Sequence, residues 1–340
     1  MKRLCIALAC LLFMAAPALG QLGVQRPDYA AATGVHVNQF GKVYFVDGTN
    51  GGDTNGGLTP ASAFATLAAA RAASAAGDTI VIAPGTYTVD VATASLAPKA
   101  NQTWMAAKPG LGGPPSVIVI ADADDHANPP VAVDVDGVVF RDIEFRLIAG
   151  GTAALYCVSA AQTTAVRGLV FEDCWLNMNS VDGAGVIACQ FNDATNAITG
   201  LVMRRCRFTG GDATTNTATY IDVGVGGIPD ALIELCMFKL ESIDGDALGL
   251  NFEDPGAAGK SYAMLIRNND FIGSSDGGDD AVGIKFAAAG DEDEIAGIIR
   301  SNFFAHCFTS PVTVEKMNAG IIWNYYGDDA VGGTLAIPGT

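Results

Sequence analysis

Carboxylates concentrate in several short acidic segments of this sequence, and carboxylate oxygen atoms are suitable ligands for a hard cation. The two richest are Ile243–Gly249 and Ser275–Gly283, with shorter relatives at Val181–Gly183, 291–294 and 327–332. Asp and Gly form tight turns unaided, because Asp bonds its own backbone and Gly supplies positive φ. Oxygen ligands from stacked turns would also suit Ca²⁺, which relieves the repulsion between close carboxylates. We expect plain turns or a calcium site made by Asp244, Asp246, Asp276, Asp279 and Asp280.

A second group with chemical potential is a set of cysteines at regular spacing. Cys174, Cys206 and Cys236 follow one another at intervals of roughly 30 residues, and Cys157 and Cys189 are separated by a similar interval. Stacked thiols in an exported chain could oxidise to disulfides. No CxxC spacing indicates zinc. The sequence therefore leaves buried free thiols, disulfides or a metal open, with thiols favoured, for Cys157, Cys174, Cys189, Cys206, Cys236 and Cys307.

Charged residues recur two positions before the same repeat position. Their signs alternate through the first five members, and the last arginine follows another arginine. Opposite charges on adjacent strands contribute a few tenths of a kcal/mol per pair, as an outward ladder. We expect such a ladder from Arg141, Glu172, Arg204, Glu234, Arg267 and Arg300.

These side chains belong to a repeat with a period of roughly 30 residues. The repeated stretch is Leu265–Phe271, and its anchor position is occupied by Ile143, Cys174, Cys206, Cys236, Asn269 and Asn302. Apolar residues stand two positions after the anchor and three before it. Short strands joined by turns at a near-constant period predict coils stacked about 4.8 Å apart. Asn269 and Asn302 are expected to be buried and to bond the neighbouring coils.

Composition and charge exclude several classes of partner. The formal net charge is −17, Gly is abundant at 41 residues, and charged residues make up only 16%. Such an acidic chain repels phosphate backbones and anionic membrane surfaces, so we expect neither nucleic-acid binding nor membrane insertion. It would also repel an acidic polysaccharide unless a cation bridged the two. Short buried strands suit this composition better than amphipathic helices.

The first twenty residues have the form of an export signal. Lys2 and Arg3 precede an apolar run from Leu4 to Ala16, and Ala18–Gly20 forms a small-residue cleavage site before Gln21. The run is too short to span a bilayer comfortably. We expect a signal peptide over 1–20, a lead-in over 21–42 and one β-helix domain over 43–340, with repeat coils over 131–326. The mature protein would be extracellular, periplasmic or on the cell surface.

The segment 43–88 is expected to cap the first coil. A strand at Val43–Val46 precedes a Gly- and Asn-rich loop, in which Asp47 and Asp53 could bind an ion but more simply form a plain loop. A helix is expected from Ala63 to Ala76, with Phe64, Leu67 and Ala68 on its apolar face. Strands then follow at Thr79–Ala83 and after the turn Pro84–Tyr87.

This opening resembles that of right-handed parallel β-helix proteins, the pectin-lyase-like superfamily. The resemblance rests on the order strand, Gly/Asp/Asn loop and short helix, followed by Gly77-Asp78-Thr79-Ile80-Val81-Ile82-Ala83-Pro84-Gly85-Thr86-Tyr87. It covers about 45 residues of the opening, and the compatible repeat extends to residue 304 or beyond. The fold class it implies is all-β, a right-handed parallel β-helix with a short N-terminal capping helix.

Two catalytic roles are implied by resemblance. Gly278–Lys285 looks like the paired-aspartate strand of polygalacturonases, which would make Asp279 and Asp280 a general acid and a base. Several polysaccharide lyases use an arginine as base, a role that Arg300 could fill. The hydrolases' Gly-His-Gly and Arg-Ile-Lys motifs have no counterpart, and Gly-Asp-Asp-Ala-Val-Gly recurs at 327–332.

The function that fits best is a secreted or surface-exposed β-helix that binds carbohydrate or another partner without catalysis. The alternatives are a polysaccharide lyase or polygalacturonase-like hydrolase, and a structural or virion-type fibre component. Fold alone does not separate these classes. Aromatic rings on which a sugar could stack are Trp104, Trp175, Trp323, Tyr325 and Tyr326.

Overall fold

The computed structural model describes residues 41–90, 95–107, 115–121, 129–147, 155–178, 186–191, 196–210, 217–224, 226–241, 247–252, 261–273, 281–286, 295–307, 310–314, 320–322 and 325–326. The chain divides into the units Met1–Val37 and Asn38–Thr340, and every described residue lies in the second. The predicted signal peptide and most of the lead-in therefore lie outside the described residues. No helix in the described part is long and apolar enough to cross a membrane.

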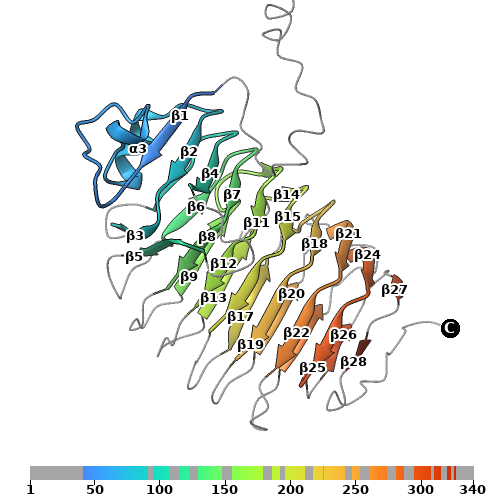
Figure 1. Ribbon diagram of the computed structural model, residues 1–340. Helices are drawn as coiled ribbons and strands as arrows, with labels where there is room; N and C mark the ends of the chain where they lie inside the picture. Colours follow the sequence, from blue (N-terminus) through green and yellow to red (C-terminus); the bar gives the residue numbers. More distant parts are fainter. Residues whose placement is uncertain are drawn as a thin grey trace, which may run out of the picture. The chain divides into compact units, whose positions relative to one another are not determined.

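Three parallel sheets run side by side along the described chain, and each coil contributes about one strand to each sheet (Figure 1). Sheet A contains, in spatial order, β1 (Val43–Val46), β2 (Thr79–Ile82), β4 (Thr103–Ala106), β7 (Val139–Arg141), β11 (Val170–Glu172), β15 (Val202–Arg204), β18 (Leu232–Glu234), β21 (Ser261–Arg267), β24 (Ile295–Arg300) and β27 (Gly320–Ile322).

The other two sheets complete each coil. Sheet B contains β3 (Gly85–Val89), β5 (Val117–Ala121), β8 (Ile143–Arg146), β12 (Trp175–Asn177), β16 (Arg207–Thr209), β19 (Met237–Leu240), β22 (Asp270–Gly273), β25 (Phe303–Ala305) and β28 (Tyr325–Tyr326). Sheet C contains β6 (Val131–Val133), β9 (Leu155–Ala160), β13 (Val186–Phe191), β17 (Ala218–Val223), β20 (Ala247–Phe252), β23 (Ala281–Phe286) and β26 (Ser310–Val314). A small additional sheet pairs β10 (Val166–Arg167) with β14 (Ile198–Thr199).

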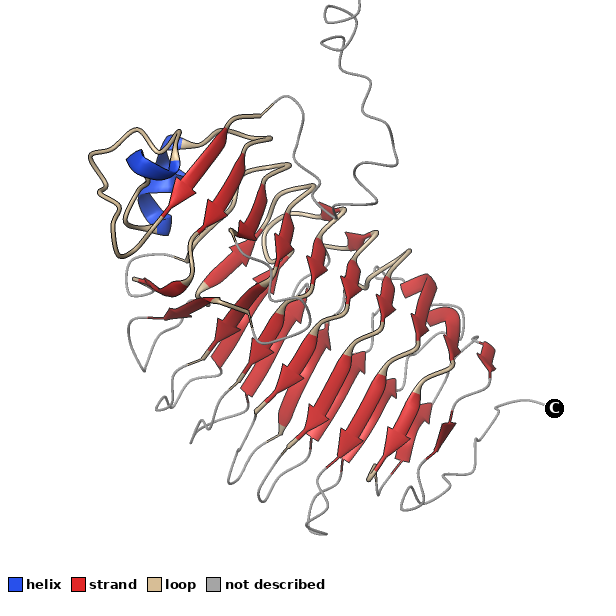
Figure 2. Ribbon diagram, viewed as in Figure 1, coloured by secondary structure: helices blue, strands red, loops and turns tan. Residues whose placement is uncertain are grey.

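The repeat period predicted from the sequence is confirmed by the strand register. Phe140, Phe171, Met203, Ile233, Ile266 and Ile299 pair in order along sheet A. Phe208, Phe238, Phe271 and Phe304 stack face to face in sheet B, with ring centroids 4.5 to 4.9 Å apart. Buried rings at the strand spacing fill the interior of the coils. The fold is a parallel β-helix with a short helix near its first strand, as the resemblance implied (Figure 2).

The repeated stretch itself proves to be a corner and not one strand. The chain leaves sheet A, passes one residue in the left-handed αL conformation and one buried anchor residue, and enters sheet B. The αL residues are Asp142, Asp173, Arg205, Leu235, Asn268 and Ser301, with φ from 53° to 57°. A second αL column lies at the start of sheet A. It comprises Asn101, Gly137, Gly168, Gly200 and Asp230, which precede their strands, and Ala263, which lies in the irregular first part of β21. Each coil thus turns sharply on both sides of sheet A.

The anchor position behaves as predicted. Asn269 and Asn302 are fully buried. The Asn269 side chain accepts a hydrogen bond from the Cys236 amide at 2.9 Å and donates to the Ile233 carbonyl at 3.0 Å. Asn302 repeats the arrangement, accepting from the Asn269 amide and donating to Ile266. Each asparagine therefore ties its own coil to the preceding one at the corner.

The cap differs from the prediction in detail. The α-helix α3 covers Leu67–Ala73 and follows a 3-10 turn, η1 (Pro60–Ser62), so it starts four residues later than expected. The Asp53 carboxylate accepts hydrogen bonds from the Ala65 and Thr66 amides, and Thr66 then caps the helix. The predicted apolar face was partly wrong, because Ala68 is exposed whereas Leu67 and Ala70 are buried.

Phe64 lies in a bridge to Val46 instead of the helix. The Phe45 amide donates to Gly57, Phe64 donates to Phe45, and the Asp47 amide donates to Phe64. A side chain at Gly57 would collide with the Phe64 ring, and φ there is +69°. The loop thus satisfies the outer edge of β1, which would otherwise be open to pairing.

Candidate functional site

All five aspartates predicted as calcium ligands, two of them also catalytic candidates, lie outside the described residues. Asp244 and Asp246 belong to the connection between β19 and β20, and Asp276, Asp279 and Asp280 to the connection between β22 and β23. Both connections lead from sheet B to sheet C, so the two segments occupy equivalent places in successive coils. Among the described residues, no three His, Cys, Asp or Glu side chains gather into a metal-binding group.

The charge ladder is confirmed on sheet A. Glu172 contacts Arg141 at 2.5 Å, and Glu234 contacts both Arg204 and Arg267 at 2.6 Å. Burial raises the pKa of Glu234, but hydrogen bonds from Arg267 and Arg204 outweigh it and hold that pKa below its ordinary value. Arg300 is exposed and pairs in register with Arg267 and Ile322. Arg300 is therefore the last member of the ladder in the described part of the chain, and its neighbour Arg267 carries the same charge.

Both aspartates of the Gly-rich loop form hydrogen bonds to nearby backbone amides. Asp47 accepts hydrogen bonds from the Thr49 and Asn50 amides and from the Asn50 side chain, and these bonds lower its pKa. Asp53 accepts from Ala65, Thr66 and the Thr66 hydroxyl. Both carboxylates thus serve the cap, the simpler of the two expected roles.

All six described cysteines are free thiols and buried. Burial raises the pKa of Cys174, Cys189 and Cys206 well above the ordinary value, so these thiols are protonated and inert at neutral pH. Cys206 donates to the Phe171 carbonyl and Cys236 to the Met203 carbonyl. In later coils, Asn269 and Asn302 donate to the equivalent carbonyls of the preceding coil. Cys157 and Cys189 lie in sheet C as expected, but Cys189 pairs with Val158.

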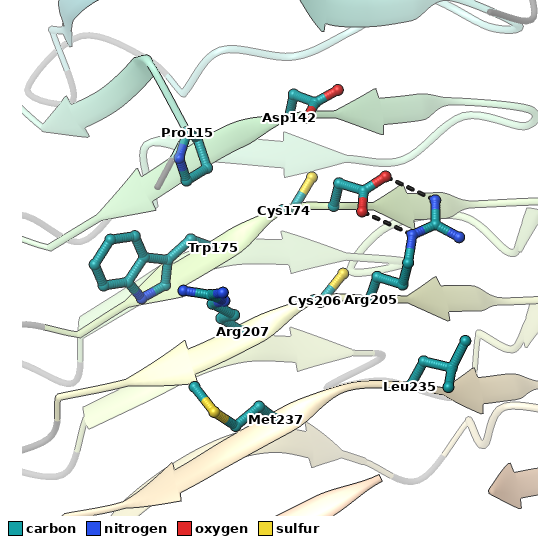
Figure 3. A pocket seen from close by; sticks show the side chains of 10 residues that line it. Pro115, Asp142, Cys174, Trp175, Arg205, Cys206, Arg207, Leu235 and Met237 are labelled. Atoms are coloured by element: carbon teal, nitrogen blue, oxygen red, sulfur yellow. Dashed lines mark hydrogen bonds and ion pairs between the residues drawn. The ribbon is translucent and has the colours of Figure 1, made fainter. Parts of the chain in front are cut away.

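A cleft of about 270 Å³ lies where sheet A turns into sheet B (Figure 3). Four consecutive αL corner residues, Asp142, Asp173, Arg205 and Leu235, form one wall. The first residues of three sheet B strands, Trp175, Arg207 and Met237, line it as well, together with the buried Cys174 and Cys206. The full lining is Pro115, Asp142, Asp173, Cys174, Trp175, Arg205, Cys206, Arg207, Leu235 and Met237.

The indole ring of Trp175 is fixed at this cleft. Its Nε1 donates a hydrogen bond of 2.6 Å to the Thr209 hydroxyl on the next coil. Trp175 pairs in register with Arg207, and Arg207 with Met237. Figure 3 shows the Arg207 side chain extending toward the Trp175 ring. The half-buried ring therefore lies along the sheet surface with a guanidinium beside it.

The corner wall carries a compact charge cluster. Arg205 donates to both oxygens of Asp173 at 2.7 Å and to Glu172 at 2.8 Å. These contacts raise the pKa of Arg205, the hydrogen bond to Asp173 being the main cause. Bidentate pairing holds the guanidinium in one plane, which fixes the shape of this wall. Such a wall offers hydrogen-bonding groups to a polar ligand while its own charges stay balanced.

The outer face of sheet B continues this polar surface toward the first coils. Glu144, although buried, contacts Arg146 at 2.5 Å and accepts a hydrogen bond from Asn177 at 2.9 Å. Asn177 pairs in register with both Arg146 and Thr209. Glu144, the register partner of Trp175 on the preceding coil, is thus held by two polar side chains.

Of the aromatic residues expected to offer rings to a sugar, only Trp175 is placed at a cleft in the described part of the chain. Trp104 is buried, and its Nε1 donates to Gln102, so the prediction for this residue was wrong. Trp323 and the side chains of Tyr325 and Tyr326 lie outside the described residues. His306 is described, half-buried and next to Cys307, whereas His36 and His126 lie outside the described residues.

Sequence reasoning missed the corner column and the outward residues beside it. Asp142, Asp173, Arg205 and Leu235 stand one position before the anchor, where no single residue type is kept along the repeat. Arg207 and Met237 stand one position after it. An alignment of the repeats at every position, and not only at the apolar ones, would have placed the corner residues in one column and the outward residues of sheet B in another.

No family model and no curated protein matches this chain. Among solved structures, it is similar to pectate lyase Pel9A, with TM-score 0.44 and 14% identity over 86% of this chain and 78% of the other. It is similar to a rhamnogalacturonan lyase, with TM-score 0.39 and 12% identity over 84% and 87%. A lacto-N-biosidase from Eubacterium ramulus gives TM-score 0.31 and 11% identity over 84% and 67%. At such scores the fold assignment rests on the strand register alone, which is that of a parallel β-helix.

Proposed function

We propose that this protein is exported and binds a glycan, without transforming it, in the cleft where sheet A turns into sheet B. The observation that carries the proposal is the fixed half-buried ring of Trp175 beside Arg207 in an open cleft. Flat aromatic faces supply apolar contact area at little cost in conformational entropy, and the apolar face of a sugar ring stacks on them. Guanidinium and carboxylate groups around the ring would bind the sugar hydroxyls.

Binding is favoured over catalysis by the state of the charged groups. Asp173 is held by both nitrogens of Arg205 in a bidentate pair, and the sheet A carboxylates Glu172 and Glu234 are bound to arginines. A general acid or base needs a proton-transfer position free to face substrate. In the described residues, these carboxylates support the corner and the ladder instead.

The test is the binding of an immobilised glycan panel by the mature protein, followed by calorimetry on each ligand found. Trp175→Ala is expected to weaken affinity roughly tenfold to a hundredfold, because it removes the aromatic face. Thr209→Val keeps the ring but removes its acceptor, so a smaller loss is expected. Phe303→Ala is the matched control, since this exposed ring lies on sheet B outside the cleft.

Assays for unsaturated uronates and reducing sugars, with and without calcium, accompany the binding experiment. Turnover that is abolished by Asp279→Asn or Arg300→Ala would overturn the binding proposal in favour of a lyase or hydrolase. The calcium arm also tests the acidic connections, where Ca²⁺ is expected to raise the melting temperature. That rise should vanish in the double variant Asp276→Asn/Asp280→Asn.

A further inference from the structure

Leu235 is the exception among the corner residues. It adopts φ +57°, a conformation that disfavours side chains with a Cβ and that Asn and Asp tolerate best. Its counterparts Asp142, Asp173, Asn268 and Ser301 are short and polar, and the long side chain of Arg205 is bonded to Asp173 and Glu172. Leu235 has no side-chain hydrogen-bonding group to compensate for this backbone, and 51% of its surface is exposed. Neither backbone preference nor burial in the core explains a leucine here.

The surroundings of Leu235 give it a candidate role. It lines the cleft together with Met237, the outward residue of the same coil, while the coils before it contribute Asp142, Asp173 and Arg205. Figure 3 shows Leu235 and Met237 at the end of the cleft opposite Asp142 and Pro115. The cleft therefore has a charged end and an apolar end along the direction in which coils stack.

A single exposed leucine signals nothing by itself. Three observations coincide here: the unfavourable αL backbone, the exposure of the side chain, and a second apolar side chain at the same end of a cleft. Backbone conformations of this kind persist where the surrounding structure fixes them, as this corner does, and they cluster at ligand-binding sites. Water over two adjacent apolar side chains is displaced favourably by an apolar group of a ligand.

Building on the proposed glycan binding, we propose that Leu235 and Met237 bind an apolar substituent of the glycan, namely an O-acyl group. The sugar ring lies on Trp175, its hydroxyls face Arg205 and Arg207, and the acyl methyl group contacts Leu235 and Met237. Leu235 is then a specificity-determining residue that is retained at the expense of stability. An unsubstituted glycan leaves the apolar end in contact with water and binds more weakly.

The test compares O-acetylated xylan and mannan oligosaccharides with their alkali-deacetylated twins on one array. Both twins are uncharged, so the net charge of the protein does not bias the comparison. The wild-type protein is expected to bind the acetylated form of its ligand about tenfold more tightly, as one apolar contact of this size provides. An array on which no acetylated glycan is preferred over its twin overturns the inference.

Leu235→Asn supplies the second readout. Asn is the residue at the same corner one coil later, at Asn268, and tolerates the αL backbone. The variant is expected to melt roughly 2 °C higher and to bind both twins equally. Leu58→Asn is the control, because Leu58 is 53% exposed in the capping loop and lies outside this cleft; neither readout should change.

The outcomes separate this inference from the proposed function. Equal binding of twins by the wild-type protein, with affinity lost in Trp175→Ala, keeps glycan binding and overturns the acyl contact. A Leu235→Asn variant that gains stability and keeps the full acetyl preference also overturns it. Absence of binding to every glycan on the array overturns both proposals.

Discussion

Individual side chains at the anchor position show how one residue type can substitute for another in a stacked coil. Cys206 and Cys236 donate weakly to the carbonyls of the preceding coil, at 3.5 Å, whereas Asn269 donates to the equivalent carbonyl at 3.0 Å and also accepts from a backbone amide. Asparagine thus bonds both backbone groups at 2.9 to 3.0 Å, distances shorter than the contact of the thiol with the carbonyl. The column changes from thiol to amide between Cys236 and Asn269, and the corner keeps its shape.

We predict that Asn269→Ala lowers the free energy of unfolding by about 2–4 kcal/mol, because the buried Cys236 amide and Ile233 carbonyl lose their partners. Asn269→Cys should lose less, since a thiol already makes the corresponding contact in earlier coils. Urea denaturation followed by circular dichroism measures both. Equal stability of the alanine variant and the wild-type protein would contradict the role assigned to Asn269.

At the scale of elements, the apolar columns were predictable and the corners were not. Phe208, Phe238 and Phe271 repeat because this interior position of sheet B admits one stacked ring per coil, and a repeated residue type is visible in a sequence. The αL corner constrains the backbone and leaves the side chain in solvent, so Asp173, Arg205 and Leu235 share a conformation but no chemistry. The cleft is made from these variable positions, so sequence periodicity could not indicate it.

The charge ladder on sheet A makes stability depend on pH. The pKa of Glu234 lies below its ordinary value near 4.5, so its carboxylate contributes stability at pH values above that ordinary value. This contribution is lost as the pH falls through the folded-state pKa. Glu234→Gln should therefore be less stable than the wild-type protein by about 1–2 kcal/mol near pH 7, and the difference should shrink as the pH falls below about 4.

Thermal unfolding of both proteins between neutral and acid pH checks this prediction. Glu241→Gln is the control, because the pair of Glu241 with Lys239 is more exposed to solvent and exposed pairs contribute little. A wild-type advantage that stays constant across the whole range would show that packing, and not the charge of Glu234, is responsible.

At the scale of the molecule, the described coils rest on one repeated design with a specialised beginning. The loop 47–64 closes the edge of β1 through backbone hydrogen bonds, and α3 packs Leu67 and Ala70 against the interior. The sequence indicated a cap through its Gly-rich loop. It did not indicate that Phe64 would bridge to Val46, because that contact depends on the capping of α3 by Thr66 and Asp53.

Export is the prediction that belongs to the whole chain. Expression of the full sequence in a secreting host should yield a mature protein that begins at Gln21, as the small residues Ala18–Gly20 indicate. Amino-terminal sequencing of the released protein measures this directly. Replacement of Leu11 and Leu12 by charged residues should abolish release, while a protein that is released with Met1 intact would contradict the proposed signal.

The corner between sheets A and B has a consequence for how such a chain can change in length. From Arg141 to Glu144 and in every later coil, the step across this corner is three residues. The return from sheet C to sheet A instead varies, and the path from Leu250 to Ile266 is four residues longer than the equivalent path from Ile221 to Ile233. The path from sheet B to sheet C varies too, since the path from Phe304 to Val312 is five residues shorter than the equivalent path from Phe271 to Ile284. Insertions are thus absorbed in these two connections, whereas the corner keeps a constant length in each of these coils. Whole coils could be duplicated or removed at this corner. Such a change would lengthen or shorten the binding surface without altering the spacing between its strands.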